Sequence, residues 1–157
     1  MLLGNIFLAL AWAALQGTFS LFNLVVGQIV GYIVLLALIK GRVLPPSPYV
    51  GRVHVAFGLV AFFLWELVVA NVRLAFDVVT PRFHMTPGIV AVPLDATGDA
   101  QILLLSILIN LTPGSVALDV SADRRVMFVH VMYMDSADSA RAEIKQGFER
   151  RVLQLLG

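Results

Sequence analysis

The stretch Val53–Val72, VHVAFGLVAFFLWELVVANV, decides how the rest of this chain is interpreted. It holds 20 residues between two arginines, and its strongly polar members are His54, Glu66 and Asn71. As a helix it would cover about 30 Å, the thickness of the hydrocarbon core of a bilayer. The sequence before it is also apolar, and the sequence after Thr80 has the pattern of a small water-soluble domain. The stretch therefore predicts the joint between a membrane part and a water-facing part.

The composition indicates an integral membrane protein. Of the 157 residues, 59% are hydrophobic, and the mean hydropathy is +0.90, whereas soluble domains are about 45–50% apolar. A net charge of +1 provides no basic field for nucleic acid. The chain has no cysteine, which excludes disulfides, thiolate nucleophiles and cysteine-ligated zinc. No metalloprotease, serine-hydrolase or P-loop spacing occurs, so we expect neither an enzyme nor a bound cofactor.

Residues 1–80 are predicted to form a transmembrane helical region with three apolar segments, 2–15, 19–39 and 53–80. Gly27 and Gly31 in the second segment have the G-x-x-x-G spacing that permits close approach of two membrane helices. Between the second and third segments, residues 40–52 contain three prolines and are predicted to form a loop.

The basic residues around the third segment conflict with three complete spans. Lys40, Arg42 and Arg52 place the loop in the cytoplasm by the positive-inside rule, and Arg73 and Arg82 place the far end there as well. A spanning helix puts its two flanks on opposite sides, so the number and orientation of the spans stay open.

The third segment carries one polar stripe. Glu66, Arg73 and Asp77 are seven and four residues apart, so a helix would place them on one face. A carboxylate inside a membrane costs at least about 2.5 kcal/mol unless it is paired or turned toward protein. Two interpretations follow: a proton or ion site in a transporter, or a structural stripe that docks this helix on a neighbour.

Residues 81–157 are predicted to form a soluble, cytoplasmic α+β domain with the element order βαββα. That order is a ferredoxin-like unit without its final strand, which leaves the first strand at an edge of the sheet. The expected elements are a strand at 89–94, a helix at 99–110, strands at 116–120 and 125–134, and a last helix that begins near 135 or 136.

The helices of this domain have local signals. Thr97 or Asp99 is expected to cap the first helix, and Asp135 or Ser136 the last. Lys145 and Glu149, four residues apart on the last helix, are expected to form a weak surface pair. Arg150 and Arg151 are expected at anionic lipid headgroups or in solvent. The last helix has apolar residues at steps of four, four and three, namely Ile144, Phe148, Val152 and Leu155.

The segment Thr112-Pro113-Gly114 is a candidate structural or assembly motif. Proline and glycine end a helix and turn the chain into the following strand. Contact with another subunit is compatible with this role. His130 shares an apolar strand face and is expected to pack there, while Asp119 and His130 on neighbouring strands form only a weak acid–base candidate.

The third strand is apolar on both faces, whereas a two-layer domain covers only one face of its sheet with helices. We therefore expect part of this apolar surface to meet a partner protein or the bilayer.

Several short motifs together resemble the E subunit of the Mrp-type (Mnh) multisubunit cation/proton antiporters. The similarity covers nearly the whole chain, and Ser115 stands where the family usually has threonine. The motifs are PGIVAVPL at 87–94, LTPGS at 111–115, LDVS at 118–121, His130-x-Met132-Tyr133, and IKxGFERR at 144–151.

The resemblance implies an accessory subunit in a bacterial plasma-membrane complex that exchanges Na⁺ for H⁺. Its partners would be the other antiporter subunits and the lipid bilayer, and it implies no redox cofactor. The subunit would support assembly, with a part in ion exchange left open. The alternatives are a purely structural assembly subunit and a membrane-tethered domain that senses a ligand.

Overall fold

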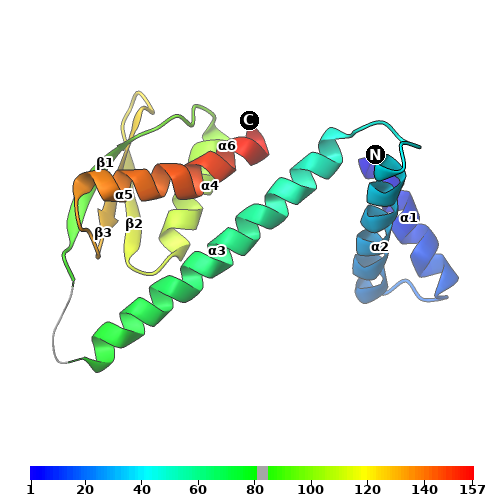
Figure 1. The fold of residues 1–157 in the computed structure, drawn as a ribbon, viewed down its shortest axis with the longest axis horizontal. Helices are drawn as coiled ribbons and strands as arrows, with labels where there is room; N and C mark the ends of the chain where they lie inside the picture. The colour runs from blue at the N-terminus through cyan, green and yellow to red at the C-terminus, as the bar shows by residue number, and fades with distance from the viewer. Residues whose placement is uncertain (81–84) are drawn as a thin grey trace. The chain divides into compact units, whose positions relative to one another are not determined.

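The computed structural model describes residues 1–80 and 85–157, which fall into two compact units, Met1–His54 and Val55–Gly157 (Figure 1). Arg82, one of the basic residues in the charge conflict, lies outside the described residues. Among those described, two helices are long and apolar enough to cross a membrane by length and composition, Leu21–Lys40 and Pro48–Val79. The N-terminal helix Leu2–Leu15 is apolar but shorter.

The first unit is a helical hairpin of α1 (Leu2–Leu15) and α2 (Leu21–Lys40). Ser20 caps α2 by accepting a hydrogen bond from the Asn23 amide. Gly27 and Gly31 lie against α1 so closely that a Cβ atom would come within 2.8 Å of the Ala9 carbonyl oxygen or 2.3 Å of Asn5 Oδ1. The predicted close approach at the glycine pair is therefore confirmed.

Helix α3 (Pro48–Val79) contains 32 residues and is about 48 Å long. It begins five residues earlier than the predicted third segment, because proline is compatible with the first turn of a helix. Of the predicted loop 40–52, only residues 41–47 are non-helical. The first turns of α3, up to His54, belong to the first unit, and the rest of α3 from Val55 belongs to the second.

The second unit contains a three-stranded sheet with the order β1-β3-β2. Strands β1 (Gly88–Pro93) and β2 (Ser115–Val120) both pair antiparallel with β3 (Val126–Val131), and α4 (Asp99–Leu111) connects β1 to β2. This is the predicted ferredoxin-like order with β1 at an edge. A β-bulge in β2 lies between Ala117 and Asp119.

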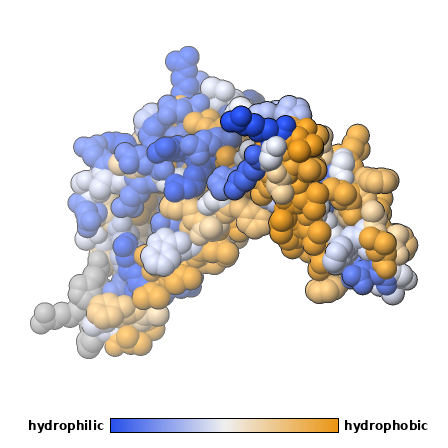
Figure 2. Space-filling view, turned by 45° about the vertical axis from the view of Figure 1, so that its right-hand side comes forward, coloured by the Kyte–Doolittle hydropathy of each residue, from blue (hydrophilic) through white to orange (hydrophobic). Residues whose placement is uncertain are grey.

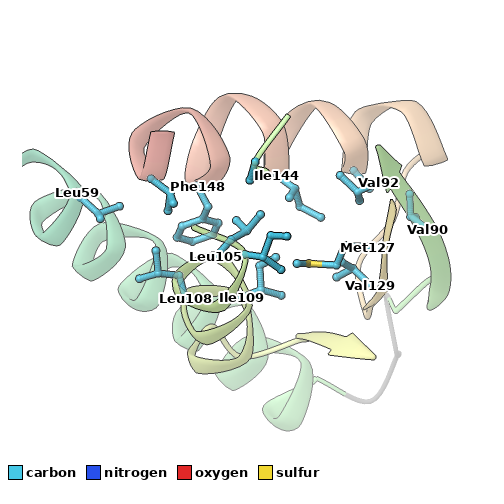
Figure 3. Packing of buried hydrophobic residues seen from close by; sticks show 14 residues of the cluster. Leu59, Val90, Val92, Leu105, Leu108, Ile109, Met127, Val129, Ile144 and Phe148 are labelled. Atoms are coloured by element: carbon cyan, nitrogen blue, oxygen red, sulfur yellow. The ribbon is translucent and has the colours of Figure 1, made fainter. Parts of the chain in front are cut away.

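Helices cover one face of this sheet and form the core with it (Figure 3). The side chains that alternate inward from β1 and β3 pack against α4 and the C-terminal helix. They include Val90, Val92, Met127, Val129, Leu105, Ile109, Ile144, Phe148 and Val152. The predicted apolar spacing of the last helix is confirmed, because Ile144, Phe148 and Val152 are all buried.

The other face of the sheet is open and partly apolar, as the composition of β3 predicts. Phe128 on β3 is exposed, as are Ile89 on β1 and Val116 and Leu118 on β2. His130 lies on this open face, opposite Ile89 and Val116, and is only half-buried. Its predicted packing against apolar neighbours therefore takes place at the surface, not in the core.

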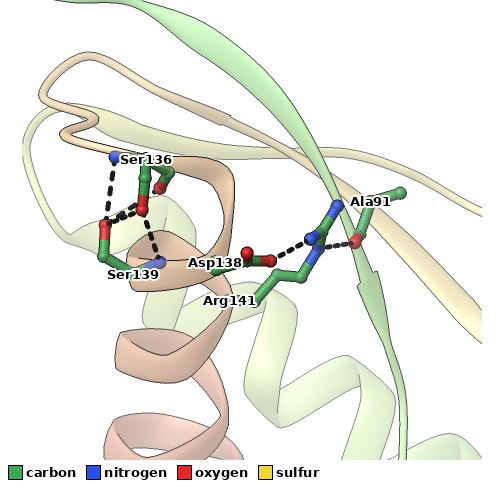
Figure 4. Close-up of polar contacts among 5 residues, drawn as sticks. All are labelled: Ala91, Ser136, Asp138, Ser139 and Arg141. Carbon is green, nitrogen blue, oxygen red and sulfur yellow. Dashed lines mark hydrogen bonds and ion pairs between the residues drawn. The ribbon is translucent and has the colours of Figure 1, made fainter.

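The edge of β1 is protected by side chains from the C-terminal helix. Arg141 Nε donates a hydrogen bond of 2.9 Å to the Ala91 carbonyl, and its guanidinium also pairs with Asp138 (Figure 4). Lys145 Nζ donates to the Pro93 carbonyl at 2.7 Å. These two contacts occupy backbone carbonyls that could otherwise accept hydrogen bonds from another strand. Pro93 adds to the protection, because proline has no amide hydrogen to donate to a further strand.

The C-terminal helix consists of α5 (Ala137–Ile144), a π-helical turn η1 (Lys145–Glu149) and α6 (Arg150–Leu156). Ser136 caps α5, as one of the two predicted alternatives. The predicted cap of α4 was wrong: Gly98 occupies the cap position, and the Gln101 side chain accepts hydrogen bonds from the Thr97 and Gly98 amides.

The predicted pair of Lys145 and Glu149 is present, but its expected position at the surface was wrong for Glu149. The Glu149 side chain is only 1% exposed, and its Oε1 accepts hydrogen bonds from the amides of Asp95 (2.6 Å) and Ala96 (3.0 Å). Lys145 lies 3.3 Å from Glu149 Oε2 and 2.9 Å from Asp95 Oδ2. Glu149 therefore joins the C-terminal helix to the turn after β1 from inside the domain.

Candidate functional site

A hollow of about 770 Å³ lies between α3 and the C-terminal domain, within the second unit. Five of the six residues singled out from the sequence line it: Glu66 and Arg73 from α3, and Thr112, Pro113 and Gly114 from the turn after α4. The sixth, Asp77, lines an adjoining hollow that shares Arg73 and Tyr133 with the first. The structure thus brings together two motifs that are about 40 residues apart in the chain.

The polar stripe of α3 faces the domain of its own chain. On the N-terminal side of the stripe in α3, Leu59 is buried in the domain core. Phe62 packs edge-on against Phe148, with ring centroids 5.3 Å apart. Gly147 in the π-helical turn makes room for this contact, because a Cβ there would lie 3.2 Å from the Phe62 ring. The same helix face continues one and three turns later to Glu66 and Arg73.

Arg73 and Asp77 both meet Tyr133, which follows β3. The Arg73 guanidinium lies 5.2 Å from the centre of the Tyr133 ring, a cation–π geometry. Asp77 is only 2% exposed. The pKa of Tyr133 is raised, first because its protonated hydroxyl can donate a hydrogen bond to the Asp77 side chain, and further because of desolvation and the charge of Asp77. The raised pKa keeps the Tyr133 hydroxyl protonated, so that it can act as a hydrogen-bond donor toward Asp77.

The turn Thr112-Pro113-Gly114-Ser115 ends α4 by a definite set of hydrogen bonds. The Ser115 amide donates to the Thr112 carbonyl at 3.3 Å, and Gly114 has φ +89°. Proline at the second and a positive-φ glycine at the third position are the pattern of a type II turn. The Thr112 and Ser115 hydroxyls donate to the carbonyls of Leu108 and Ile109, which satisfies acceptors at the end of α4.

Sequence reasoning missed the place of Arg151 and Glu143, which line the same hollow from the C-terminal helix. The Arg151 guanidinium lies 3.7 Å from the centre of the Phe62 ring, and its Nη1 donates to the Gly147 carbonyl at 2.8 Å. Arg151 is half-buried against its own chain, a position that the sequence did not indicate. Phe62 precedes Arg151 by almost 90 residues, so the sequence does not indicate their contact. The one available signal was that Arg151 lies close to the apolar Phe148 on the same helix.

The weak acid–base candidate receives no support from the sheet register. Asp119 on β2 lies opposite Phe128, and His130 on β3 lies opposite Val116. The two side chains are therefore not cross-strand partners. The charged groups that do converge, from α3 and from the C-terminal helix, are suited to holding the two parts of the chain together.

Comparison with known proteins agrees with the architecture and the motifs. A family model described as "Na+/H+ ion antiporter subunit" matches residues 5–155. The chain is 30% identical to the E subunit of the Na(+)/H(+) antiporter of Alkalihalophilus pseudofirmus, over 96% of this chain and 94% of that protein. It is 32% identical to the protein of the same name from Bacillus subtilis, with the same coverage.

Two solved complexes contain similar chains. One is the membrane-bound sulfane sulfur reductase, an archaeal respiratory membrane complex, with 27% identity, a TM-score of 0.57 and coverage of 96% of this chain and 95% of that one. The other is the Mrp complex of a Dietzia species, with 25% identity, a TM-score of 0.50 and coverage of 62% and 92%. With the family model and the curated relatives, these similarities show that the chain belongs to the E-subunit family of multisubunit Na⁺/H⁺ antiporters.

Proposed function

We propose that this subunit serves assembly of the antiporter, and that the stripe Glu66, Arg73 and Asp77 docks α3 on the chain's own C-terminal domain instead of forming an ion path. The observation that carries the proposal is the contact of Arg73 and Asp77 with Tyr133. Polar residues of an apolar helix are stabilised when they turn toward protein groups. Here each member of the stripe faces a hollow lined by the domain.

The chemistry of the hollow also favours docking. A proton relay needs a succession of titratable groups that leads across the membrane. The hollow instead combines carboxylates and guanidinium groups from one chain, with Arg151 stacked on Phe62 and Arg73 on Tyr133. Cation–π contacts of this kind contribute roughly 0.5–1 kcal/mol each at exposed sites. The proposed role of the chain is accordingly structural and not catalytic.

The proposal places residues 1–80 with the membrane and residues 81–157 at the cytoplasmic surface of a bacterial plasma membrane. Apolar helices α2 and α3 support the first part. Basic residues near both ends of the apolar stretch of α3, Arg52 and Arg73, support a cytoplasmic position of the segments at its two ends. The compact units divide at His54, but this division describes contacts within the chain and not the border between lipid and water.

Exchange measurements on a Glu66→Gln variant test the proposal. The substitution removes the charge and keeps the shape, so Na⁺/H⁺ exchange in inside-out vesicles should persist in a complex of normal composition. A matched control is Glu143→Gln, which removes a carboxylate from the opposite wall of the same hollow. Loss of exchange with Glu66→Gln alone, in a fully assembled complex, would refute docking and place Glu66 on an ion path.

A second variant tests the assembly role directly. Asp77→Asn alters a buried carboxylate that faces Tyr133, so the amount of this subunit in the purified complex should fall. Normal subunit amounts combined with reduced exchange would contradict the proposed role of the stripe.

A further inference from the structure

We infer that the face of α3 that points away from the domain is a lipid-binding surface, and that α3 lies along the membrane surface on the domain's side instead of crossing the bilayer. The inference uses the proposed membrane association but not the proposed cytoplasmic location, and its test separates the two.

Helix α3 has two opposite faces of different character. The residues that contact or face the domain recur at helical spacing, at Leu59, Phe62, Glu66, Arg73 and Asp77. The residues on the outward side are mostly apolar and strongly exposed, with Trp65 at 66%, and the side-chain amide of exposed Asn71 donates to the Leu67 carbonyl of its own helix. The apolar ones are Phe57, Leu64, Trp65, Val68, Val72 and Val79.

This arrangement is the reverse of a helix on the surface of a soluble domain. Such a helix turns its apolar stripe to the core and its polar side chains to water. In α3 the stripe Glu66, Arg73 and Asp77 turns toward the domain, and hydrophobic side chains gather on the exposed side (Figure 2). An exposed apolar face of this length requires a nonpolar environment.

A crossing orientation conflicts with the contacts of the domain. The domain lies along α3 from Leu59 to Asp77, which corresponds to about 27 Å of helix. The hydrocarbon core is only about 30 Å thick. Phe62 is near the middle of α3, so a spanning α3 would place the Arg151 guanidinium on its ring deep in the bilayer, together with Glu143. Charged groups are strongly disfavoured there.

An orientation along the surface removes this conflict and the charge conflict of the sequence. The domain stays in water, the outward face enters the boundary between headgroups and acyl chains, and Trp65 occupies the depth that tryptophan prefers. Lys40 and Arg42 before α3, Arg52 in its first turns and Arg73 near its end then lie on one side of the membrane. Both flanks satisfy the positive-inside rule at once.

The absence of cysteine in the natural chain allows a direct test by single-cysteine labelling in the assembled complex. Arg52→Cys and Val78→Cys mark the two ends of α3, and Arg124→Cys in the exposed hairpin turn reports the side of the domain. A membrane-impermeant maleimide should label all three from the same side, in either intact cells or inside-out vesicles. Labelling of Arg52→Cys and Val78→Cys from opposite sides would overturn the inference. Labelling of all three only from outside would support it and refute the cytoplasmic location.

Nitroxide labels on the outward face provide the second measurement, in a complex whose other subunits lack reactive cysteines. At Phe57, Leu64, Val68 and Val79 we expect high oxygen accessibility and similar shallow depths, within about 5–10 Å of the headgroup boundary. A spanning helix would instead give depths that rise toward about 15 Å at its middle and fall at both ends. Low oxygen accessibility at all four positions would mean that protein covers this face, which also overturns the inference.

Discussion

Gly114 allows the most specific test of the fold around the hollow. Its φ of +89° lies in the region that favours glycine, because a Cβ there approaches the neighbouring backbone. A Cβ built on Gly114 would meet Tyr133 and Met132 side-chain atoms at 3.5–3.6 Å, which is ordinary contact. The cost of a substitution should therefore come from the backbone conformation and not from crowding.

The expected magnitude follows from this geometry. Gly114→Ala should lower the free energy of unfolding of the second unit by about 1–2 kcal/mol, and Gly114→Val by somewhat more because its branched side chain restricts the backbone further. Gly114→Asn should cost less than either, since asparagine tolerates positive φ. This order, Asn, then Ala, then Val, distinguishes strain from loss of space.

The assay is thermal unfolding of the purified full-length subunit, together with its amount in the membrane. Gly58→Ala is the matched control: Gly58 lies inside α3 with nothing within 4 Å of an added Cβ, so alanine should be neutral or stabilising. Equal stability of Gly114→Val and the natural protein would refute the reasoning. Unchanged stability with lost exchange would instead indicate a direct functional role for the turn.

Three further predictions concern other parts of the chain. Residues 82–157 expressed alone should aggregate or self-associate, because the domain loses the apolar cover of α3; a soluble monomer that unfolds cooperatively would contradict this and favour a sensor domain. Gly31→Leu should disrupt the α1–α2 hairpin, measured by crosslinking, whereas Gly4→Ala should not, since a Cβ at Gly4 meets nothing within 4 Å. Burial disfavours the charged form of Lys145, but the carboxylates of Asp95 and Glu149 outweigh this effect and raise the pKa of Lys145. The stabilisation that charged Lys145 contributes should therefore be present at neutral pH and be lost only as the pH rises above the ordinary lysine value of 10.5. In unfolding measured as a function of pH, a Lys145→Met variant should lack this loss of stability at alkaline pH.

Features that depend on a few neighbouring residues could be predicted from the sequence. The turn at Gly114 follows from proline and glycine in adjacent positions, and the cap at Ser136 from one hydroxyl before a helix. The order of the sheet follows from the succession βαββα, since few topologies accommodate it. Close helix contact at Gly27 and Gly31 follows from their spacing.

Features that depend on distant segments required the tertiary structure. Glu149 has the spacing of a surface partner for Lys145, yet its side chain is buried, where it accepts hydrogen bonds from the amides of Asp95 and Ala96. Those amides are more than 50 residues away, and no local pattern indicates that the chain returns there. The same holds for Arg151 and Phe62.

The polar stripe of α3 shows what the sequence determines and what depends on the tertiary structure. Helical periodicity places Glu66, Arg73 and Asp77 on one face and the apolar residues on the other, so the two faces follow from the sequence alone. Periodicity does not determine what each face meets, because a polar face is equally stabilised by another protein, an ion or the chain's own domain. Only the tertiary structure brings Arg73 and Asp77 to Tyr133, since these contacts form when residues about 60 positions apart come together in the folded chain.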